Sequence, residues 1–287
     1  MKNKIRMIGI DLDGTLLTRA KVLTPGCREA VEAAMEAGME VVPVTGRPLT
    51  GVPAEVLEIP GIRYAITSNG ANTYDLIENR VLRKAHLPHW AVRRILEKAA
   101  GEDVIREIFV RGIGYHDPHT QTMLEERFSV APPILAYINR SRQIVPDFDE
   151  LLYDPGAHVE NVSLMFRTQE ERDSAFRELI HIRAENGSRL LHVLVPWKTD
   201  LEVTHVDADK WLALHGLGKR LGIDAQLIMA IGDGDNDRPM LRGAGLSFAM
   251  GNAPEFVRET ADFVTADNEH DGAAAAIHRV LKANAGM

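Results

Sequence analysis

The sequence predicts an α/β protein whose core is a doubly wound, mainly parallel sheet, interrupted by a second domain of α+β type. Short apolar runs, typical of strands buried on both faces, alternate with amphipathic helical patterns near both ends of the chain. From about residue 83 to 200, no apolar run is followed by the acids or the Thr-Gly pair that follow the strands near both ends of the chain. We therefore expect a core built from residues 1–82 and 202–287, with residues 83–201 inserted into it.

The N-terminal part of the core contains the first group of strands and one clearly delimited helix. The expected strands are IRMIGI at 5–10, MEVVPVTG at 39–46 and YAITSNG at 64–70. Thr24 and Pro25 open the helix, and Gly38 closes it, because a hydroxyl before the first turn and a glycine after the last are typical helix ends.

The C-terminal part repeats the alternation. Strands are expected in LIMAIGDG at 227–234, LSFAMG at 246–251 and DFVT at 262–265, with helical segments between them. Asp271 is expected to cap the last helix. Sheets of this class bind ligands at the carboxyl ends of their strands. The polar residues that follow the strands are therefore the first place to look for a site.

The inserted segment has a different pattern. We expect a helix at 89–101, a strand at 105–110, a polar loop at 112–121, a strand at 161–167, a helix after Gln169 and a strand at 192–197. His116 and His119 in the polar loop could suggest zinc, but no cysteine or third histidine lies nearby in the sequence. We therefore expect both histidines at the surface.

Composition excludes several classes of function. The chain has 287 residues, with 45% hydrophobic and 26% charged residues, which is typical of a globular protein. Its net charge of −8 argues against a nucleic-acid or anionic-membrane partner. A single cysteine, Cys27, rules out an internal disulfide, and no apolar run is long enough to span a bilayer. We expect a cytoplasmic protein; the sequence does not indicate its oligomeric state.

Four short pieces of sequence together suggest chemistry. They are DLDGT at 11–15, VTGR at 44–47, Lys210 at the start of a helical stretch, and GDGDND at 232–237. Several carboxylates can converge on one point only around a metal or with displaced protons, and oxygen ligands suit Mg²⁺. A hydroxyl, a glycine amide and an ammonium group beside such a metal would bind an anion. The combination indicates phosphoryl transfer.

Each piece alone also has an ordinary explanation. Acids at strand ends are often turn residues or helix caps, and a lone helical lysine is usually solvated. GDGDND resembles a calcium loop, but counted from Asp233 the sixth and twelfth positions are Arg238 and Ala244, which excludes an EF-hand. Asn69 is first of all a turn residue. For Arg47 we favour a salt bridge at a helix start over a phosphate contact.

The order of the four motifs is similar to that in haloacid dehalogenase-like hydrolases. The run at 232–277 and the ITSNGA segment at 66–71 resemble the Cof-type, sugar-phosphatase-like branch of that superfamily. The resemblance covers roughly residues 5–82 and 202–280. It implies a Rossmann-like core with a large α/β cap between the second and third motifs. Trp211 departs from the small residue that the family often has after its lysine.

The resemblance also implies roles for individual residues. Asp11 is expected to be the nucleophile, and Asp13 the general acid that later activates water. Asp11, the backbone carbonyl of Asp13, and Asp233 would bind Mg²⁺, while Asp237 would support the metal shell or orient Lys210. The expected phosphate or substrate contacts are Thr45, the Gly46 amide, Lys210, Asn236 and Asn69.

The sequence therefore predicts a Mg²⁺-dependent phosphatase acting on a small phosphorylated metabolite, with sugar phosphates as the expected class. The cap would select the substrate. Two alternatives stay open at this point. A phosphomutase would use the same aspartyl-phosphate, and a non-catalytic regulator would bind a phosphate or a sugar on the same scaffold.

Overall fold

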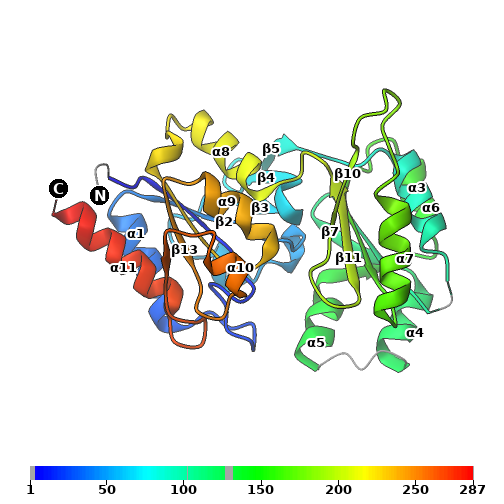
Figure 1. Cartoon of the computed structure of the whole chain (residues 1–287), viewed down its shortest axis with the longest axis horizontal. Coiled ribbons are helices and arrows are strands. Elements are labelled where there is room, and N and C mark those ends of the chain that lie inside the picture. Colours follow the sequence, from blue (N-terminus) through cyan, green and yellow to red (C-terminus); the bar gives the residue numbers. More distant parts are fainter. Residues whose placement is uncertain (1–3, 102, 127–131, 287) are drawn as a thin grey trace. The chain divides into compact units, whose positions relative to one another are not determined.

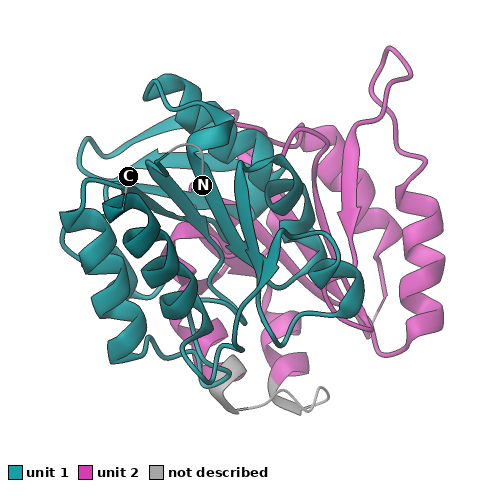
Figure 2. Cartoon of the chain, turned by 60° about the vertical axis from the view of Figure 1, so that its left-hand side comes forward, with its two compact units in different colours: residues 1–46, 52–83, 209–287 teal, residues 47–51, 84–208 magenta. Residues whose placement is uncertain are grey.

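The computed structural model describes residues 4–101, 103–126 and 132–286. The chain divides into two compact units, coloured separately in Figure 2. Unit 1 contains residues 1–46, 52–83 and 209–287, and unit 2 contains residues 47–51 and 84–208. In these described ranges no helix is both long and apolar enough to cross a bilayer.

Unit 1 is built around a five-stranded sheet in which every neighbouring pair is parallel. The strand order is β14-β13-β12-β1-β2. The strands are β1 (Met7–Ile10), β2 (Glu40–Pro43), β12 (Ile228–Gly232), β13 (Leu246–Ala249) and β14 (Phe263–Val264). Its longer helices, labelled in Figure 1, are α1 (Pro25–Glu36), α8 (Lys210–Arg220), α9 (Arg238–Gly243) and α11 (Gly272–Ala285).

Helices cover both faces of this sheet. Ile8 and Ile10 of β1 pack in one apolar cluster with residues of α1 and α11, whereas Met7 packs in another with residues of α8 and α9. This alternation follows from the two-residue period of a strand. At Gly9 a β-carbon would overlap with Leu214, so the glycine allows α8 to approach β1 closely. The predicted α/β class with a doubly wound, mainly parallel sheet is confirmed.

A small antiparallel sheet completes unit 1. It consists of β3 (Tyr64–Thr67), β4 (Asn72–Asp75) and β5 (Arg80–Lys84). Two short helices, α2 (Ala54–Leu57) and α10 (Glu255–Arg258), also belong to unit 1. A single parallel bridge between Val44 and Ile66 connects β3 to the end of β2. The strand expected at 64–70 therefore ends at Thr67, and a 3-10 turn (Ser68–Gly70) follows it.

The two expected helix caps have different outcomes. Thr24 caps α1 as predicted, because its hydroxyl accepts a hydrogen bond from the Cys27 N–H. Asp271 stands at the N-cap position of α11 as predicted, but its side chain makes no capping hydrogen bond to that helix. The Asp271 carboxylate instead accepts a hydrogen bond from the Thr24 hydroxyl at 2.5 Å, which ties the starts of the two neighbouring helices together.

Unit 2 contains a six-stranded sheet with the order β10-β11-β9-β6-β7-β8, antiparallel except for the β7–β8 pair. The strands are β6 (Ile105–Val110), β7 (Ile113–His116), β8 (Arg142–Ile144), β9 (Val159–Met165), β10 (Leu191–Leu194) and β11 (Asp200–His205). The helices are α3 (His89–Lys98), α4 (Pro118–Glu126), α5 (Pro132–Ser141), α6 (Phe148–Tyr153) and α7 (Gln169–Leu179).

The prediction of a polar loop at 112–121 was wrong. That segment forms β7 and the start of α4, and β7 is paired on both sides by β6 and β8. Its glycine and polar residues are poor strand formers, but tertiary pairing overrides such local preference. His116 is consequently buried rather than at the surface, whereas His119 is exposed as expected.

Candidate active site

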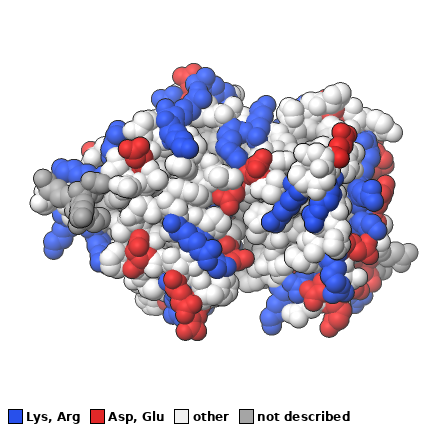
Figure 3. All heavy atoms as spheres, turned by 45° about the horizontal axis from the view of Figure 1, so that its top comes forward, with Lys and Arg blue, Asp and Glu red and all other residues white. Residues whose placement is uncertain are grey.

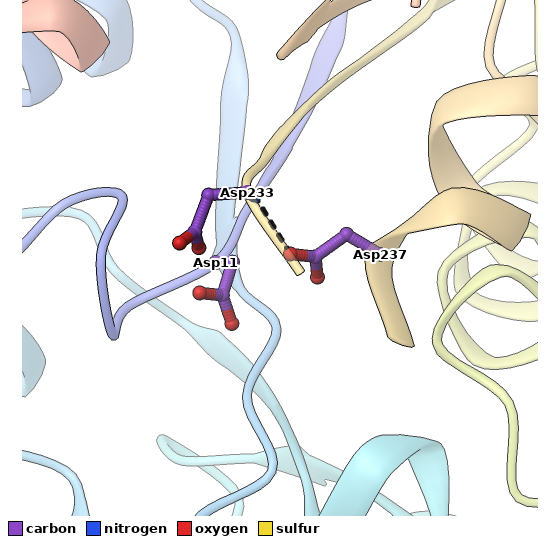
Figure 4. Close-up of side chains that lie close together, drawn as sticks. All are labelled: Asp11, Asp233 and Asp237. Carbon is purple, nitrogen blue, oxygen red and sulfur yellow. Dashed lines mark hydrogen bonds between the residues drawn. The ribbon is translucent and has the colours of Figure 1, made fainter. Parts of the chain in front are cut away.

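The polar motifs of unit 1 follow three neighbouring strands. Asp11 comes directly after β1, Asp233 directly after β12, and Thr45 two residues after the end of β2. Because β1 lies between β12 and β2 and all three are parallel, their carboxyl ends meet at one edge of the sheet. Figure 4 shows the carboxylates of Asp11, Asp233 and Asp237 gathered there.

Lys210 connects two of these acids. Its ammonium group lies 2.7 Å from Asp11 Oδ1 and 2.6 Å from Asp237 Oδ1, and all three side chains are buried. Lys210 is the first residue of α8, and the Asp209 side chain caps that helix by accepting a hydrogen bond from the Leu212 N–H. This N-cap hydrogen bond fixes the first turn of α8 and therefore the position of the Lys210 backbone.

Asp237 also holds its own loop in place. Its Oδ2 atom accepts hydrogen bonds from the backbone N–H groups of Asp233, at 2.9 Å, and Gly234, at 2.8 Å. A β-carbon at Gly232 would lie 2.5 Å from Asp237 Cβ, so only glycine fits between β12 and this side chain. One carboxylate thus orients both the lysine and the backbone that presents Asp233.

The Asp233 carboxylate is held from two further directions. Oδ1 accepts a hydrogen bond from the Thr15 hydroxyl at 3.1 Å, and Oδ2 accepts one from the Asn252 amide at 3.2 Å. Gly14 passes directly beside it with φ +82°, and a β-carbon there would overlap with Asp233 Oδ2. The turn after β1 therefore requires glycine both for its backbone conformation and for space.

The electrostatics of the cluster disfavour three bare carboxylates. Burial, and then the charge of Asp237, raises the pKa of Asp11 well above its usual range and that of Asp233 to about 7. Burial by itself would lower the pKa of Lys210, but the Asp11 and Asp237 carboxylates hold that pKa above its ordinary value. The single ammonium group therefore compensates only part of the negative charge.

A divalent cation fits this arrangement. One oxygen from each of Asp11, Asp233 and Asp237 lies within 4.8 Å of the other two. Hard carboxylate oxygens are the ligands that Mg²⁺ and similar cations prefer. A bound cation would also neutralise the charge that raises the two pKa values. The cluster can therefore hold a metal ion.

Asp13 is placed differently from the three clustered acids. Its Oδ1 atom lies 2.6 Å from the Lys21 ammonium group, and both side chains are about one-third exposed. Lys21 has a left-handed backbone, with φ 64°, in the turn before α1. No motif in the sequence singles out this lysine. The two carboxylates of DLDGT thus receive different cationic partners, Lys210 for Asp11 and Lys21 for Asp13.

Thr45, Asn69 and Asn236 are linked by hydrogen bonds beside the cluster. The Asn69 N–H donates to the Thr45 carbonyl at 3.0 Å, and the Asn236 amide donates to Asn69 Oδ1 at 3.0 Å. Asn69 has a left-handed backbone, with φ 56°, in the turn after β3. It is therefore a turn residue, as predicted, and its side chain also meets the GDGDND loop. Gly46 follows Thr45 as the last residue of that segment of unit 1.

Arg47 belongs to unit 2. Its guanidinium group donates to the Gly51 carbonyl at 2.8 Å and lies over the Tyr137 ring, 4.5 Å from the centroid.

Two asparagines that the sequence analysis did not select support the site. The Asn252 amide donates to both Asp233 and the Gly14 carbonyl, and its oxygen accepts a hydrogen bond from the Asn268 N–H. The Asn268 amide in turn donates to the Leu17 carbonyl. Neither asparagine carries charge or a diagnostic spacing, so only its position in the folded chain identifies it.

Charged side chains elsewhere do not form an extended field of one sign on the face shown in Figure 3, where acidic and basic groups are interspersed. On that face the figure gives no support for binding a polyanion.

Comparison with known proteins gives a consistent picture. The family model of the haloacid dehalogenase-like hydrolases matches residues 8–277. The chain is 29% identical to 5-amino-6-(5-phospho-D-ribitylamino)uracil phosphatase YcsE of Bacillus subtilis, over 96% of each protein. It is 28% identical to pyridoxal phosphate phosphatase YbhA of Escherichia coli, over 96% of this chain and 98% of YbhA.

Solved structures show the same relationship. A haloacid dehalogenase-like hydrolase from B. subtilis superposes with a TM-score of 0.82 at 26% identity, covering 96% of this chain and 99% of the other. The subclass IIB sugar phosphatase BT4131 superposes with a TM-score of 0.77 at 25% identity, covering 96% and 98%. The resemblance inferred from the motifs is thereby confirmed: the chain belongs to the haloacid dehalogenase-like hydrolases, in their Cof-type branch, and is a phosphoric monoester hydrolase.

Proposed function

We propose that this phosphatase hydrolyses a small sugar phosphate in a Mg²⁺-dependent reaction that passes through an aspartyl-phosphate on Asp11. The observation that carries the proposal is the buried Lys210 ammonium group, which contacts Asp11 and Asp237. A carboxylate oxygen of Asp233 lies within 4.8 Å of oxygens of both acids, close enough for one metal ion to bind all three. A nucleophilic carboxylate, a cation and a metal-binding acid in one place are the components of phosphoryl transfer.

The first step forms the intermediate. An Asp11 carboxylate oxygen attacks the phosphorus atom, and the bond between phosphorus and the ester oxygen breaks. Asp13, protonated at this stage, gives its proton to the departing oxygen, so the product leaves as a neutral alcohol. The Lys21 ammonium group, 2.6 Å from Asp13, stabilises the carboxylate that this proton transfer leaves.

The second step returns the enzyme to its initial state. The Asp13 carboxylate takes a proton from a water molecule, whose oxygen attacks phosphorus and breaks the acyl-phosphate bond. Inorganic phosphate leaves and Asp11 is again a carboxylate. Negative charge spreads over the phosphoryl oxygens in both steps. Lys210, Thr45, the Gly46 amide and Asn236 would hold these oxygens, and Mg²⁺, when bound by Asp11, Asp233 and the Asp13 carbonyl, supplies positive charge.

The named substrates of the relatives support the substrate class. YcsE acts on a phosphorylated ribitylamino-uracil, YbhA on pyridoxal phosphate, and BT4131 is a sugar phosphatase. All three names describe phosphatases of small molecules. We extend this to the present chain and expect a small phosphate monoester, with sugar phosphates preferred and the cap (unit 2) selecting among them. A cytoplasmic location also stays a prediction.

The decisive experiment compares two matched variants. Phosphate release from a panel of phosphorylated metabolites is measured with Mg²⁺ and with chelator, for the wild type, Asp11→Asn and Asp235→Asn. Asp235 lies in the same acidic loop, but it is exposed and paired with Arg238, so its variant should retain activity. Asp11→Asn should abolish release, and acid-quenched wild type should carry a phosphate adduct on Asp11.

The two alternatives give different results in the same experiment. A phosphomutase would form the adduct but require a bisphosphate and release little inorganic phosphate. A non-catalytic binder would show no release and no adduct although its metal site is filled. Equal activity of the wild type and Asp11→Asn would contradict the proposal.

A further inference from the structure

Four neighbouring strands of the unit 1 sheet are followed by loops that meet at one edge. β14, β13, β12 and β1 are consecutive in the sheet and parallel, so their carboxyl ends lie along the same side. The loops that follow these strands contain, in the same order, Asn268, Asn252, Asp233 and Gly14. The four residues are far apart in the sequence, and hydrogen bonds connect them.

Asn252 is the centre of these contacts. Its side-chain amide donates to the Gly14 carbonyl at 2.9 Å and to Asp233 Oδ2 at 3.2 Å. Its side-chain oxygen accepts a hydrogen bond from the Asn268 N–H at 3.1 Å. The buried Asn268 amide holds the turn after β1 at a second point, because it donates to the Leu17 carbonyl at 2.9 Å. Both ends of the Asn252 side chain are therefore engaged, which fixes its orientation.

The two groups to which Asn252 donates belong to the two segments that contain expected metal ligands. Asp233 offers a carboxylate oxygen to the acidic cluster, drawn in Figure 4. The Gly14 carbonyl directly follows the Asp13 carbonyl along the chain. The Asn252 amide therefore fixes the Asp233 carboxylate and the turn after β1 relative to each other.

The hydrogen-bond donors to Asp233 are neutral, unlike the donor to the other two acids of the cluster. Those two acids share the Lys210 ammonium group. Within the described residues, the hydrogen bonds to the Asp233 carboxylate come from Asn252 and from the Thr15 hydroxyl. A neutral donor orients a carboxylate without repelling a cation, and the oxygen that accepts the bond keeps another lone pair for a metal ion. Asp233 is thus held in one orientation while its own charge remains available.

We propose that Asn252 is a positioning residue that sets the affinity of the site for its divalent cation. The inference rests on the proposed function, in which Mg²⁺ is bound by Asp11, Asp233 and the Asp13 carbonyl. If the Asn252 amide is removed, the Asp233 side chain and the turn after β1 gain freedom in the metal-free protein, and cation binding must restrict it again. Hydrogen-bonding partners of metal ligands typically contribute about 10- to 100-fold in affinity or activity.

The test measures Mg²⁺ affinity directly, by isothermal titration calorimetry of the metal-free protein. The dissociation constant of Asn252→Ala should be at least about 10-fold higher than that of the wild type. Asn284→Ala is the matched control, because the Asn284 side chain also ties two groups in unit 1, the N–H and the carbonyl of Ile5, at 3.1 and 2.9 Å. Ile5 precedes β1, at the end of the strand away from the acids. Asn284→Ala should lower the melting temperature and leave Mg²⁺ affinity unchanged.

Kinetics separate the positioning of metal ligands from a general structural role. Phosphate release by Asn252→Ala should be reduced at low Mg²⁺ and approach the wild-type rate when Mg²⁺ is raised by about the same factor as the dissociation constant, with the KM for the phosphate ester unchanged. If Asn252 only held the loops together, its removal would lower the melting temperature and high Mg²⁺ would not restore activity. If Asn252→Ala does not fold, Asn252→Ser, which keeps a smaller polar group at this position, is measured in its place.

Two results would overturn the inference and leave the proposed function intact. Equal Mg²⁺ affinity of the wild type and Asn252→Ala would show that Asn252 does not position the metal ligands. An equal loss of affinity in Asn252→Ala and Asn284→Ala would show that affinity follows the overall stability of unit 1. If the wild type binds neither Mg²⁺ nor Mn²⁺, the proposed function fails, and the inference fails with it.

Discussion

The metal-free protein should become less stable as the pH rises from about 4 to 7, because of Asp233. In the unfolded chain this carboxyl group ionises near pH 3.8, whereas burial and the charge of Asp237 raise its pKa to about 7 in the folded protein. Between these values the folded state binds more protons than the unfolded state. The contribution of Asp233 to stability therefore decreases with pH over this interval and levels off above about pH 7.

The size of the effect follows from the two pKa values. They differ by about three pH units, and each unit corresponds to about 1.4 kcal/mol, which gives about 4 kcal/mol in total. Asp11, whose pKa is also raised by burial and by the charge of Asp237, acts in the same direction, whereas His86 acts in the opposite direction because burial lowers its pKa to about 4. The Asp233 contribution must therefore be isolated as the difference between the wild type and Asp233→Asn.

Thermal unfolding in chelator at several pH values measures this difference. The free energy of unfolding of Asp233→Asn should equal that of the wild type near pH 4. At pH 8 it should exceed the wild-type value by up to about 4 kcal/mol, which follows from the same pKa difference. Asp235→Asn, an exposed neighbour, should follow the wild type throughout. Mg²⁺ should stabilise the wild type at pH 8 and not Asp233→Asn. Parallel pH curves for the wild type and Asp233→Asn would refute the reasoning.

Three further predictions concern single contacts. Gly14→Ala should lower phosphatase activity at least 100-fold and reduce stability by about 1–3 kcal/mol, because its backbone is left-handed and its β-carbon would displace Asp233; kinetics and thermal unfolding check both. Lys210→Met should destabilise the metal-free protein by about 3–5 kcal/mol, since it leaves buried acids without a cation; urea unfolding in chelator would contradict this if the midpoint did not fall. Arg142→Met should lower the free energy of unfolding by a similar amount, because it leaves the buried Glu107 carboxylate without its cation. Adding Glu107→Leu to this variant should restore most of the lost stability in the same urea unfolding experiment.

The main sheet could be predicted because its strands are buried on both faces. The continuous apolar runs of β1, β12 and β13 fall within the segments expected as strands. β7 was missed, and β4, β5, β8 and β11 were not expected, because these strands carry mixed residues and depend on pairing with partners distant in sequence. Local preference says little about such strands.

The candidate site could be predicted only in outline. Acids that follow parallel strands must lie near one another, so Asp11 and Asp233 could be grouped from the sequence alone. Lys21, Asn252 and Asn268 could not, because their contacts depend on the paths of loops. The catalytic and binding roles assigned to all these residues stay predictions until the variants are measured.

The position of β1 in the sheet affects how the protein is made. The strand that Asp11 follows, β1, is synthesised first, but one of its two neighbours, β12, is synthesised only after the whole of unit 2. During translation the β12-facing edge of β1 therefore waits unpaired on the ribosome, whereas residues 84–208 emerge as one uninterrupted segment. An apolar strand with an open edge is prone to wrong pairing. Newly made chains should thus be most vulnerable to aggregation before residue 232 emerges, and premature termination before that point should yield products that cannot complete the parallel sheet.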